Sequence, residues 1–246
     1  MENETQHTKK KFSINPNLYT PIAIVIAGIL IGAGLFAASA WKTSSGSGNG
    51  AAAAPVIPNA STLVDSSDPV VGDANAPVVM AYWFDYQCPY CKENEVNTIS
   101  QVVKEYVVTG KLRIVYKDFA FLGQDSYTLG EVARAVWEVN PQKFADWHHA
   151  MFVDQGKEGS GWATTAEIQK VTTSVLSASE TTRVMQLAKQ KATTYQAAMD
   201  SDKNEAVAIG VQGTPAMLVG TQMIGGALPY AQVKAAIDSE LSKAKK

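Results

Sequence analysis

The sequence has very little cysteine. Of its 246 residues only two are cysteines, Cys88 and Cys91, and they stand three positions apart. A small disulfide-stapled fold uses more cysteines at wider spacing. A zinc site would need two further ligands, and apart from this pair the chain offers three histidines and no other cysteine. We therefore expect no metal site and interpret the two cysteines as reactive groups.

The sequence also lacks an excess of positive charge. It has 21 Lys and Arg against 23 Asp and Glu, a formal net charge of −2. A nucleic-acid-binding surface needs a clear cationic excess, so we predict no nucleic-acid partner. The apolar share of 46% is ordinary for a globular protein, and the length allows one sizeable domain with attachments.

One uncharged apolar run, residues 21–41, has about the length that a helix needs to cross a bilayer, roughly 20 residues. Three lysines precede it and only Lys42 closely follows. The positive-inside rule then predicts a cytoplasmic tail over 1–20, a transmembrane anchor over 21–41 and a catalytic domain outside the cytoplasm. The alternative is a cleaved signal peptide, because Ala38-Ser39-Ala40 resembles a cleavage site; both interpretations export the domain.

Residues 42–60 are rich in Ser, Gly, Ala and Pro and predict a flexible linker, with the folded domain over 61–246. The first part of that domain alternates strand and helix. An apolar run with β-branched and aromatic residues predicts a strand over 77–84, and Pro89 suits the first position of a helix that runs to about Val108. A second strand follows over 112–117.

Helical periodicity then dominates from about 125 to 202. Within it, Thr164 with Glu167 and Ser177 with Glu180 match the capping-box pattern, which predicts helices starting near 165 and 178. A hairpin of two short strands over 216–225 and a last helix from Pro229 complete the order. Early βαβ pairing and a late hairpin predict an α/β fold with a mixed sheet.

The two cysteines fall where chemistry is favoured. Cys88 directly follows a strand and opens a helix, where free N–H groups and the helix dipole stabilise an anion. A thiolate there has a lowered pKa and is the nucleophile. Cys91 lies one turn further on and is placed to resolve a mixed disulfide. The competing interpretation is a purely structural disulfide, which would close a tiny loop and stabilise little.

The Cys88-Pro89-Tyr90-Cys91 motif, the helical block and Gly213-Thr214-Pro215 before a hairpin together resemble the DsbA-like branch of the thioredoxin superfamily. The sequence resembles membrane-tethered DsbA/BdbD-type proteins in particular, over about 69–241. It implies a thioredoxin fold with a helical subdomain inserted over about 125–202 and thiol–disulfide oxidoreductase activity. It implies no cofactor beyond the redox-active disulfide.

The resemblance also assigns roles around the cysteines. It implies that the Thr214–Pro215 bond is cis and that this loop lies against the pair, offering backbone groups to a substrate strand. Pro89 and Tyr90, between the cysteines, are expected to tune the redox potential. Many relatives carry a buried acid six residues before the first cysteine, where this chain has Tyr82. Lys117 or Asp118 are the candidates to move the proton of the second thiol instead; the alternative is that no such group exists and water takes this role.

For the direction of electron flow, the predicted function is donation of the Cys88–Cys91 disulfide to thiols of exported proteins through a mixed disulfide at Cys88. A membrane partner of the quinone-reductase type, DsbB-like or VKOR-like, would reoxidise this monomeric, membrane-anchored protein. One alternative is a reductase or isomerase; isomerases of this superfamily usually add a dimerisation domain, for which 42–61 is too short. Another is a binding or chaperone module with a permanent disulfide.

Overall fold

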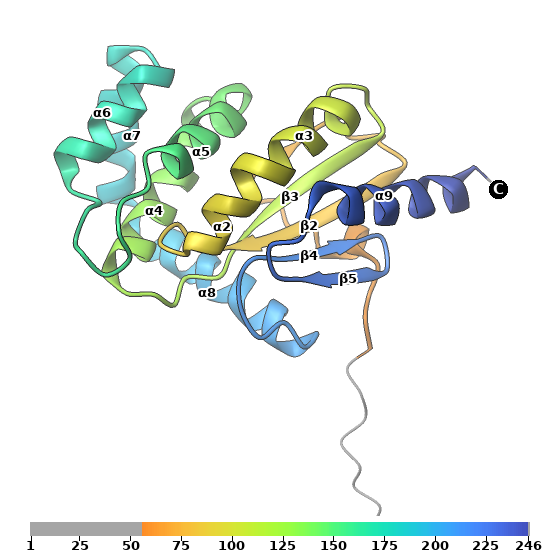
Figure 1. The fold of residues 1–246 in the computed structure, drawn as a ribbon. Helices are drawn as coiled ribbons and strands as arrows, with labels where there is room; N and C mark the ends of the chain where they lie inside the picture. The colour runs from red at the N-terminus through yellow and green to blue at the C-terminus, as the bar shows by residue number, and fades with distance from the viewer. Residues whose placement is uncertain (1–55, 246) are drawn as a thin grey trace, which may run out of the picture. The chain divides into compact units, whose positions relative to one another are not determined.

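The computed structural model describes residues 56–245 (Figure 1). The predicted tail over 1–20, the membrane anchor over 21–41 and most of the linker lie outside these residues. No helix within the described part is long and apolar enough to cross a membrane.

A five-stranded mixed sheet forms the centre of the domain, in the order β1-β3-β2-β4-β5. The strands β2 and β3 run parallel, and the other neighbouring pairs are antiparallel, which confirms the predicted mixed sheet. Every residue of β2 is buried, because helices or loops cover both faces of this central strand. The strands are β1 (Val70–Val71), β2 (Val78–Phe84), β3 (Leu112–Asp118), β4 (Ala216–Val219) and β5 (Gln222–Gly225).

The helix predicted over 88–108 is present, but it is not regular. Its order is α2 (Pro89–Asn94), the π-helical turn η3 (Glu95–Ile99), α3 (Ser100–Val102) and a second π-helical turn, η4 (Val103–Val107). Gly110 follows at a φ of 70°, a conformation that glycine adopts without strain, and the chain turns into β3. The wider π-helical turns have no signal in the apolar periodicity of the sequence.

The predicted helical block is also present and runs somewhat beyond 202. Both predicted helix starts are confirmed, at Thr165 and Ala178, and Ser177 with Glu180 forms the complete capping box. At Thr164 the side chain caps the helix by accepting from the Glu167 N–H. The block contains α4 (Gln124–Val139), η5 (Pro141–Lys143), α5 (Phe144–Val153), α6 (Thr165–Val175), α7 (Ala178–Gln190) and α8 (Ala192–Ala208).

The two faces of the sheet are buried by separate apolar cores. Tyr82 and Phe84 of β2 enter one core together with Cys91, whereas Trp83 between them enters the other. The helix α9 (Tyr230–Ala244) lies beside α3 over the first face, and α8 approaches β3 (Figure 1). The alternation along β2 therefore points Tyr82 toward the helix that carries the cysteines.

The folded part begins slightly before the predicted boundary at residue 61. Asn59 caps the short 3₁₀ helix η2 (Ala60–Leu63), Ala60 donates its N–H to the Gly220 carbonyl, and Ile57 packs against the second core. The last residues of the predicted linker are thus part of the domain. Their Pro and Ala content is typical of a linker, and their partner Gly220 is too distant in sequence to reveal the contact.

Candidate active site

Cys88 lies at the N-cap of α2, four residues after the end of β2. The Sγ atom is 3.5 Å from the Thr214 carbonyl oxygen, and the residue is only 4% exposed. Hydrogen bonds from the Cys91 thiol, from Thr214 and from the backbone N–H groups of Cys91 and Tyr90 lower the pKa of Cys88 to about 6, against opposition from burial. The N-terminal N–H groups of a helix stabilise a thiolate in this way.

Cys91 has the opposite character. It is fully buried, and burial together with the neighbouring Cys88 raises its pKa well above the usual value of a thiol. Both cysteines are free thiols in the structure. The reduced pair therefore divides into a Cys88 thiolate that accepts a hydrogen bond and a Cys91 thiol that donates it.

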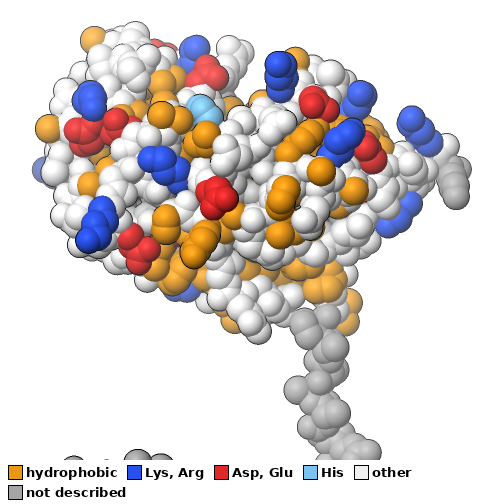
Figure 2. Space-filling view, in the orientation of Figure 1, with side chains coloured by type: hydrophobic (Ala, Val, Ile, Leu, Met, Phe, Trp, Pro, Cys, Tyr) orange, Lys and Arg blue, Asp and Glu red, His pale blue; other side chains and the backbone are white. Residues whose placement is uncertain are grey.

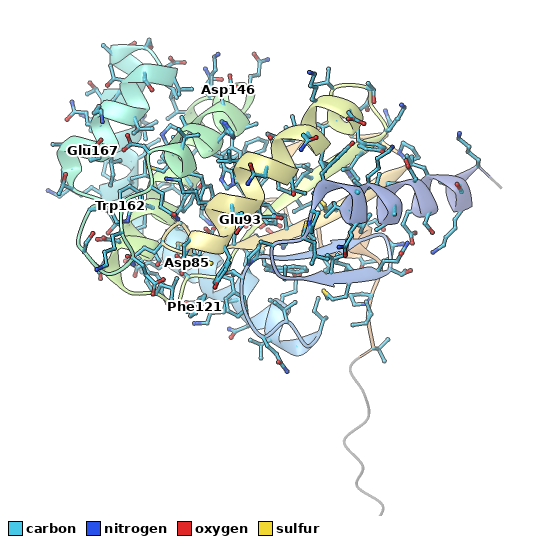
Figure 3. All side chains as sticks on the ribbon, in the orientation of Figure 1. Asp85, Glu93, Phe121, Asp146, Trp162 and Glu167 are labelled. Carbon is cyan, nitrogen blue, oxygen red and sulfur yellow. The ribbon has the colours of Figure 1, made fainter. Side chains whose placement is uncertain are left out.

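The turn before Cys88 is held by buried side chains that the sequence analysis did not single out. The carboxylate of Asp85 accepts four hydrogen bonds, from the Gln87, Phe121 and Leu122 N–H groups and from the Ser126 hydroxyl. Figure 3 shows Asp85 beside the start of α2, with Phe121 next to it. An aspartate two residues before a backbone donor is a turn signal, but its long-range partners have no sequence signature.

Gln155, from the loop after α5, fixes the other side of this turn. Its Nε2 atom donates to the carbonyls of Tyr86 and Cys88, at 2.7 and 3.1 Å. Gln87 in turn accepts the Gly159 N–H through its side-chain oxygen. The helical block therefore positions the cysteine pair by direct hydrogen bonds.

The predicted loop and the predicted dipeptide both lie at the cysteines. The Thr214–Pro215 bond is cis, as the resemblance implied, and Thr214 contacts Cys88 through its carbonyl. A cavity of about 400 Å³ runs along this loop from Gly210 to Gly226. Pro89 occupies the first turn of α2, and Tyr90 is 64% exposed beside the buried thiols.

The two proton-transfer candidates lie in a buried ion cluster. Lys117 Nζ is 2.7 Å from Asp68 Oδ2 and 3.2 Å from Asp202 Oδ1, and Arg134 Nε is 2.9 Å from Asp118 Oδ2. Lys117 is in register with Trp83, so it faces the second core, away from the face that Cys91 occupies. Neither candidate has a direct contact with a cysteine among those that the structure describes.

Tyr82 lies on the cysteine side, where the family would carry an acid. It is fully buried, and burial followed by the charges of Cys91 and Glu95 raises the pKa of its phenol well above 10. Glu95 is itself buried, with its carboxylate oxygens 3.5 Å from His148 Nε2 and 3.5 Å from His149 Nδ1. The sequence analysis did not select Glu95, because its partners lie on another helix.

The face drawn in Figure 2 has apolar side chains interspersed with single acidic and basic groups, and no block of one charge covers it.

Comparison with known proteins identifies the family to which this fold and cysteine pair belong. Residues 65–239 match the family model described as Thioredoxin. The chain belongs to the thioredoxin family.

Named relatives agree with this membership. Disulfide bond formation protein D of Bacillus subtilis is 27% identical over 173 residues, which cover 70% of this chain and 77% of that protein. The crystal structure of oxidised BdbD from Bacillus subtilis superposes with a TM-score of 0.66 at 24% identity, covering 76% of this chain and 98% of that chain. That of α-DsbA2 from Wolbachia pipientis gives 0.60 at 22%, with 71% and 88% covered.

The last two likenesses concern the fold, while the family match and the named relatives bear on activity. Together they identify this thioredoxin-family chain as a thiol–disulfide oxidoreductase of the DsbA-like branch.

Proposed function

We propose that the protein is a disulfide donor that acts outside the cytoplasm on the thiols of exported proteins. A substrate thiolate attacks Cys88 Sγ, the Cys88–Cys91 bond breaks, and Cys91 takes the electron pair. The substrate's second thiolate then attacks the substrate sulfur of the mixed disulfide, and Cys88 leaves as a thiolate. The substrate is thereby oxidised and both cysteines are reduced.

The observation that carries the proposal is the lowered pKa of Cys88, at about 6. A thiolate that is stable in the reduced protein makes Cys88 a good leaving group when the substrate resolves the mixed disulfide, and it makes the disulfide the less favoured state. The value lies below the ~7 of thioredoxin and above the ~3.5 of DsbA. We assign this tuning to the dipeptide Pro89-Tyr90, whose Tyr90 N–H donates to Cys88, and to the thiol and N–H of Cys91.

The loop at Thr214 and Pro215 supports a role in holding the substrate. The Pro215 nitrogen has no proton to donate, whereas the backbone of Thr214 lies at Cys88 and suits β-type pairing with an extended chain. Two aromatic side chains near the cysteines are exposed: Tyr90 is 64% exposed, and Phe121, whose N–H donates to Asp85, is 46% exposed. Such rings are suited to unfolded segments, which present apolar side chains.

The cellular setting is proposed from the sequence and the named relatives. Residues 21–41 would anchor a monomer in the membrane with the N-terminus in the cytoplasm, and relatives carry the name disulfide bond formation protein. Continued donation needs an acceptor for the electrons, for which we propose a membrane quinone reductase of the DsbB-like or VKOR-like type. No cofactor other than the disulfide is required by the exchange steps.

The test is the equilibrium reduction potential of the full chain in glutathione buffers. A donor should lie closer to the ~−120 mV of DsbA than to the ~−270 mV of thioredoxin. A potential near −270 mV would contradict donation and favour the reductase.

A variant pair checks that the cysteines act as assigned. Cys88→Ser should abolish oxidation of a reduced test protein, because no mixed disulfide can form. Cys91→Ser should instead accumulate mixed disulfides, since the resolving thiol is gone. Full activity of the Cys88→Ser chain would exclude the enzymatic interpretation and favour the binding module.

A further inference from the structure

The thiol of Cys91 needs a route for its proton, because the residue is fully buried. When the Cys88–Cys91 disulfide is opened, Cys91 leaves as a thiolate whose high pKa makes it a strong base. When the disulfide forms again, the same proton must be removed. The position where the family would carry an acid holds Tyr82, and Lys117 faces the other core.

Glu95 lies one helical turn from Cys91 on the same buried face. Its N–H donates to the Cys91 carbonyl, and residues spaced by four on a helix have Cβ atoms about 5–6 Å apart. Both side chains belong to the same side of the sheet as Tyr82, and the negative charges of both raise the pKa of the Tyr82 phenol. Tyr82 therefore lies near Cys91 and Glu95 at once.

Glu95 is an unusual buried acid because its contacts are loose. Its carboxylate lies between His148 and His149, each at 3.5 Å, a separation suited to an ion pair but long for a hydrogen bond. Within the described part of the chain, Glu95 Oε2 and His148 Nε2 make no hydrogen bond, and neither do the Tyr82 hydroxyl and the Asn94 amide. Buried polar atoms without partners are rare and often mark functional sites.

His149 connects this buried acid to the surface. The side chain of His149 is 40% exposed, whereas that of His148 is fully buried and bonds the Tyr86 hydroxyl through Nδ1 at 2.8 Å. Although burial opposes ionisation of Glu95, the two histidines lower its pKa below the usual value. The adjacent Glu95 carboxylate raises the pKa of His149, against opposition from burial.

We propose that Glu95 carries the proton of Cys91 to and from solvent by way of His149. During resolution of a mixed disulfide, the Cys91 thiol gives its proton to the Glu95 carboxylate, and the thiolate attacks Cys88 Sγ. The Cys88–Cys91 bond forms, the partner leaves as a thiolate, and Glu95 passes the proton through His149 to water. Opening of the disulfide runs through the same groups in reverse, so no further reactant is consumed.

Several groups face Glu95 and will contribute to any pH dependence. Tyr82 approaches from β2, Tyr116 from β3, Cys91 from its own helix and the two histidines from α5. Asp118 lies within electrostatic range of His148, and Asp146 of His149.

The inference extends the proposed function, but its test does not depend on the direction of electron flow. The reduced full chain is mixed with oxidised glutathione, quenched with acid at intervals and analysed by mass for the glutathione adduct at Cys88. The first step reports Cys88, and decay of the adduct reports Cys91. A chain that failed as a donor in the potential measurement would still give both steps.

We expect Glu95→Gln to form the adduct at the normal rate and to resolve it about 100-fold more slowly at pH 7, the lower end of general acid–base assistance. The defect should shrink toward pH 9, where hydroxide replaces the carboxylate. Glu95→Asp should recover part of the rate. The matched control is Glu93→Gln, which removes an exposed acid from the same helix (Figure 3) and should behave as the unmodified chain.

A second variant keeps the test independent of any folding defect at the buried site. The His149 side chain is 40% exposed, so His149→Gln should not disturb the core. This variant should slow resolution by less than Glu95→Gln, and added imidazole should restore the rate. Resolution that is equal to or faster than normal in Glu95→Gln would overturn the proposal, because Glu95 would then act only as a charge that keeps Cys91 protonated. Unchanged resolution in His149→Gln would exclude the route to the surface.

Discussion

The domain contains two buried clusters of charge, and they are built differently. In the ion cluster, Lys117 and Arg134 make close contacts with carboxylates, at 2.7 Å to Asp68 and 2.9 Å to Asp118. In the cluster beneath Cys91, Glu95 lies 3.5 Å from each histidine. Close ion pairs suit a fixed structural role, while the longer separations leave Glu95 able to exchange a proton.

Position 82, where the resemblance implies a buried acid, holds a tyrosine in this chain. Tyr82 brings a phenol with a raised pKa, which stays neutral over the working range and cannot replace a carboxylate. Glu95 supplies a carboxylate from the helix instead of from the strand. Lys117 and Asp118, the candidates from sequence, are already paired with opposite charges in the ion cluster, Lys117 with Asp68 and Asp118 with Arg134.

The largest expected effect comes from breaking the ion cluster. Lys117→Met should lower the free energy of unfolding by about 3–5 kcal/mol, because it leaves buried carboxylates without their cation. The measurement is urea unfolding of the oxidised chain. The residual folded protein should keep a normal rate of adduct resolution, since Lys117 faces away from Cys91.

The control for this variant is Lys143→Met, which removes the same charge from an exposed pair with Asp146. A surface ion pair contributes at most about 1 kcal/mol, so unfolding should hardly change. If Lys117→Met were as mild as the control, or if it slowed resolution as Glu95→Gln does, the division of roles between the two clusters would be wrong.

A second, smaller effect is the pH dependence of the reduced protein. The pKa of Cys88 is about 6 in the folded state, below that of an unfolded thiol, so folding favours its thiolate. This stabilisation is fully present above the unfolded pKa of ~8.5 and is lost as pH falls through 6. The melting temperature of the reduced chain, measured relative to the oxidised chain, should therefore rise from pH 5 to pH 8.

The Cys88→Ser chain is the reference for that measurement, because it has no thiol at this position to titrate. Its melting temperature should not show the rise between pH 5 and 8 that the reduced chain shows. A rise of equal size in Cys88→Ser would assign the pH dependence to groups other than the Cys88 thiol.

Local signals in the sequence predicted much of this structure. The strands around the cysteines, the hairpin after Pro215 and the helix starts at Thr165 and Ala178 all follow from patterns within a few residues. The Cys88–Cys91 spacing at a helix start likewise indicated the chemistry. The resemblance supplied the cis bond at Pro215, which the residues alone do not indicate.

What the sequence did not reveal depends on contacts between distant residues. Lys117 and Asp202 are 85 positions apart, and Glu95 meets its histidines from a different helix. No periodicity marks such pairs, so the sequence alone indicates Lys117 as a candidate proton carrier and gives no reason to select Glu95. The π-helical turn that starts at Glu95 could not be predicted either, because apolar spacing alone does not distinguish it from an α-helix.

The smallest expected effect comes from removing the N-cap of α7, a local feature outside both charge clusters. Ser177→Ala removes the side chain that caps α7 by accepting the Glu180 N–H, and should cost about 1 kcal/mol in urea unfolding. Thr182→Ala on the same helix is the control, because its hydroxyl only bonds the Ala178 carbonyl and alanine favours a helix. Adduct formation and resolution should be unchanged in both variants. A resolution defect in Ser177→Ala would mean that the stability of the helical block affects the reaction of Cys91. The slower resolution in Glu95→Gln could then arise from lost stability as well, and would no longer assign a selective role to Glu95.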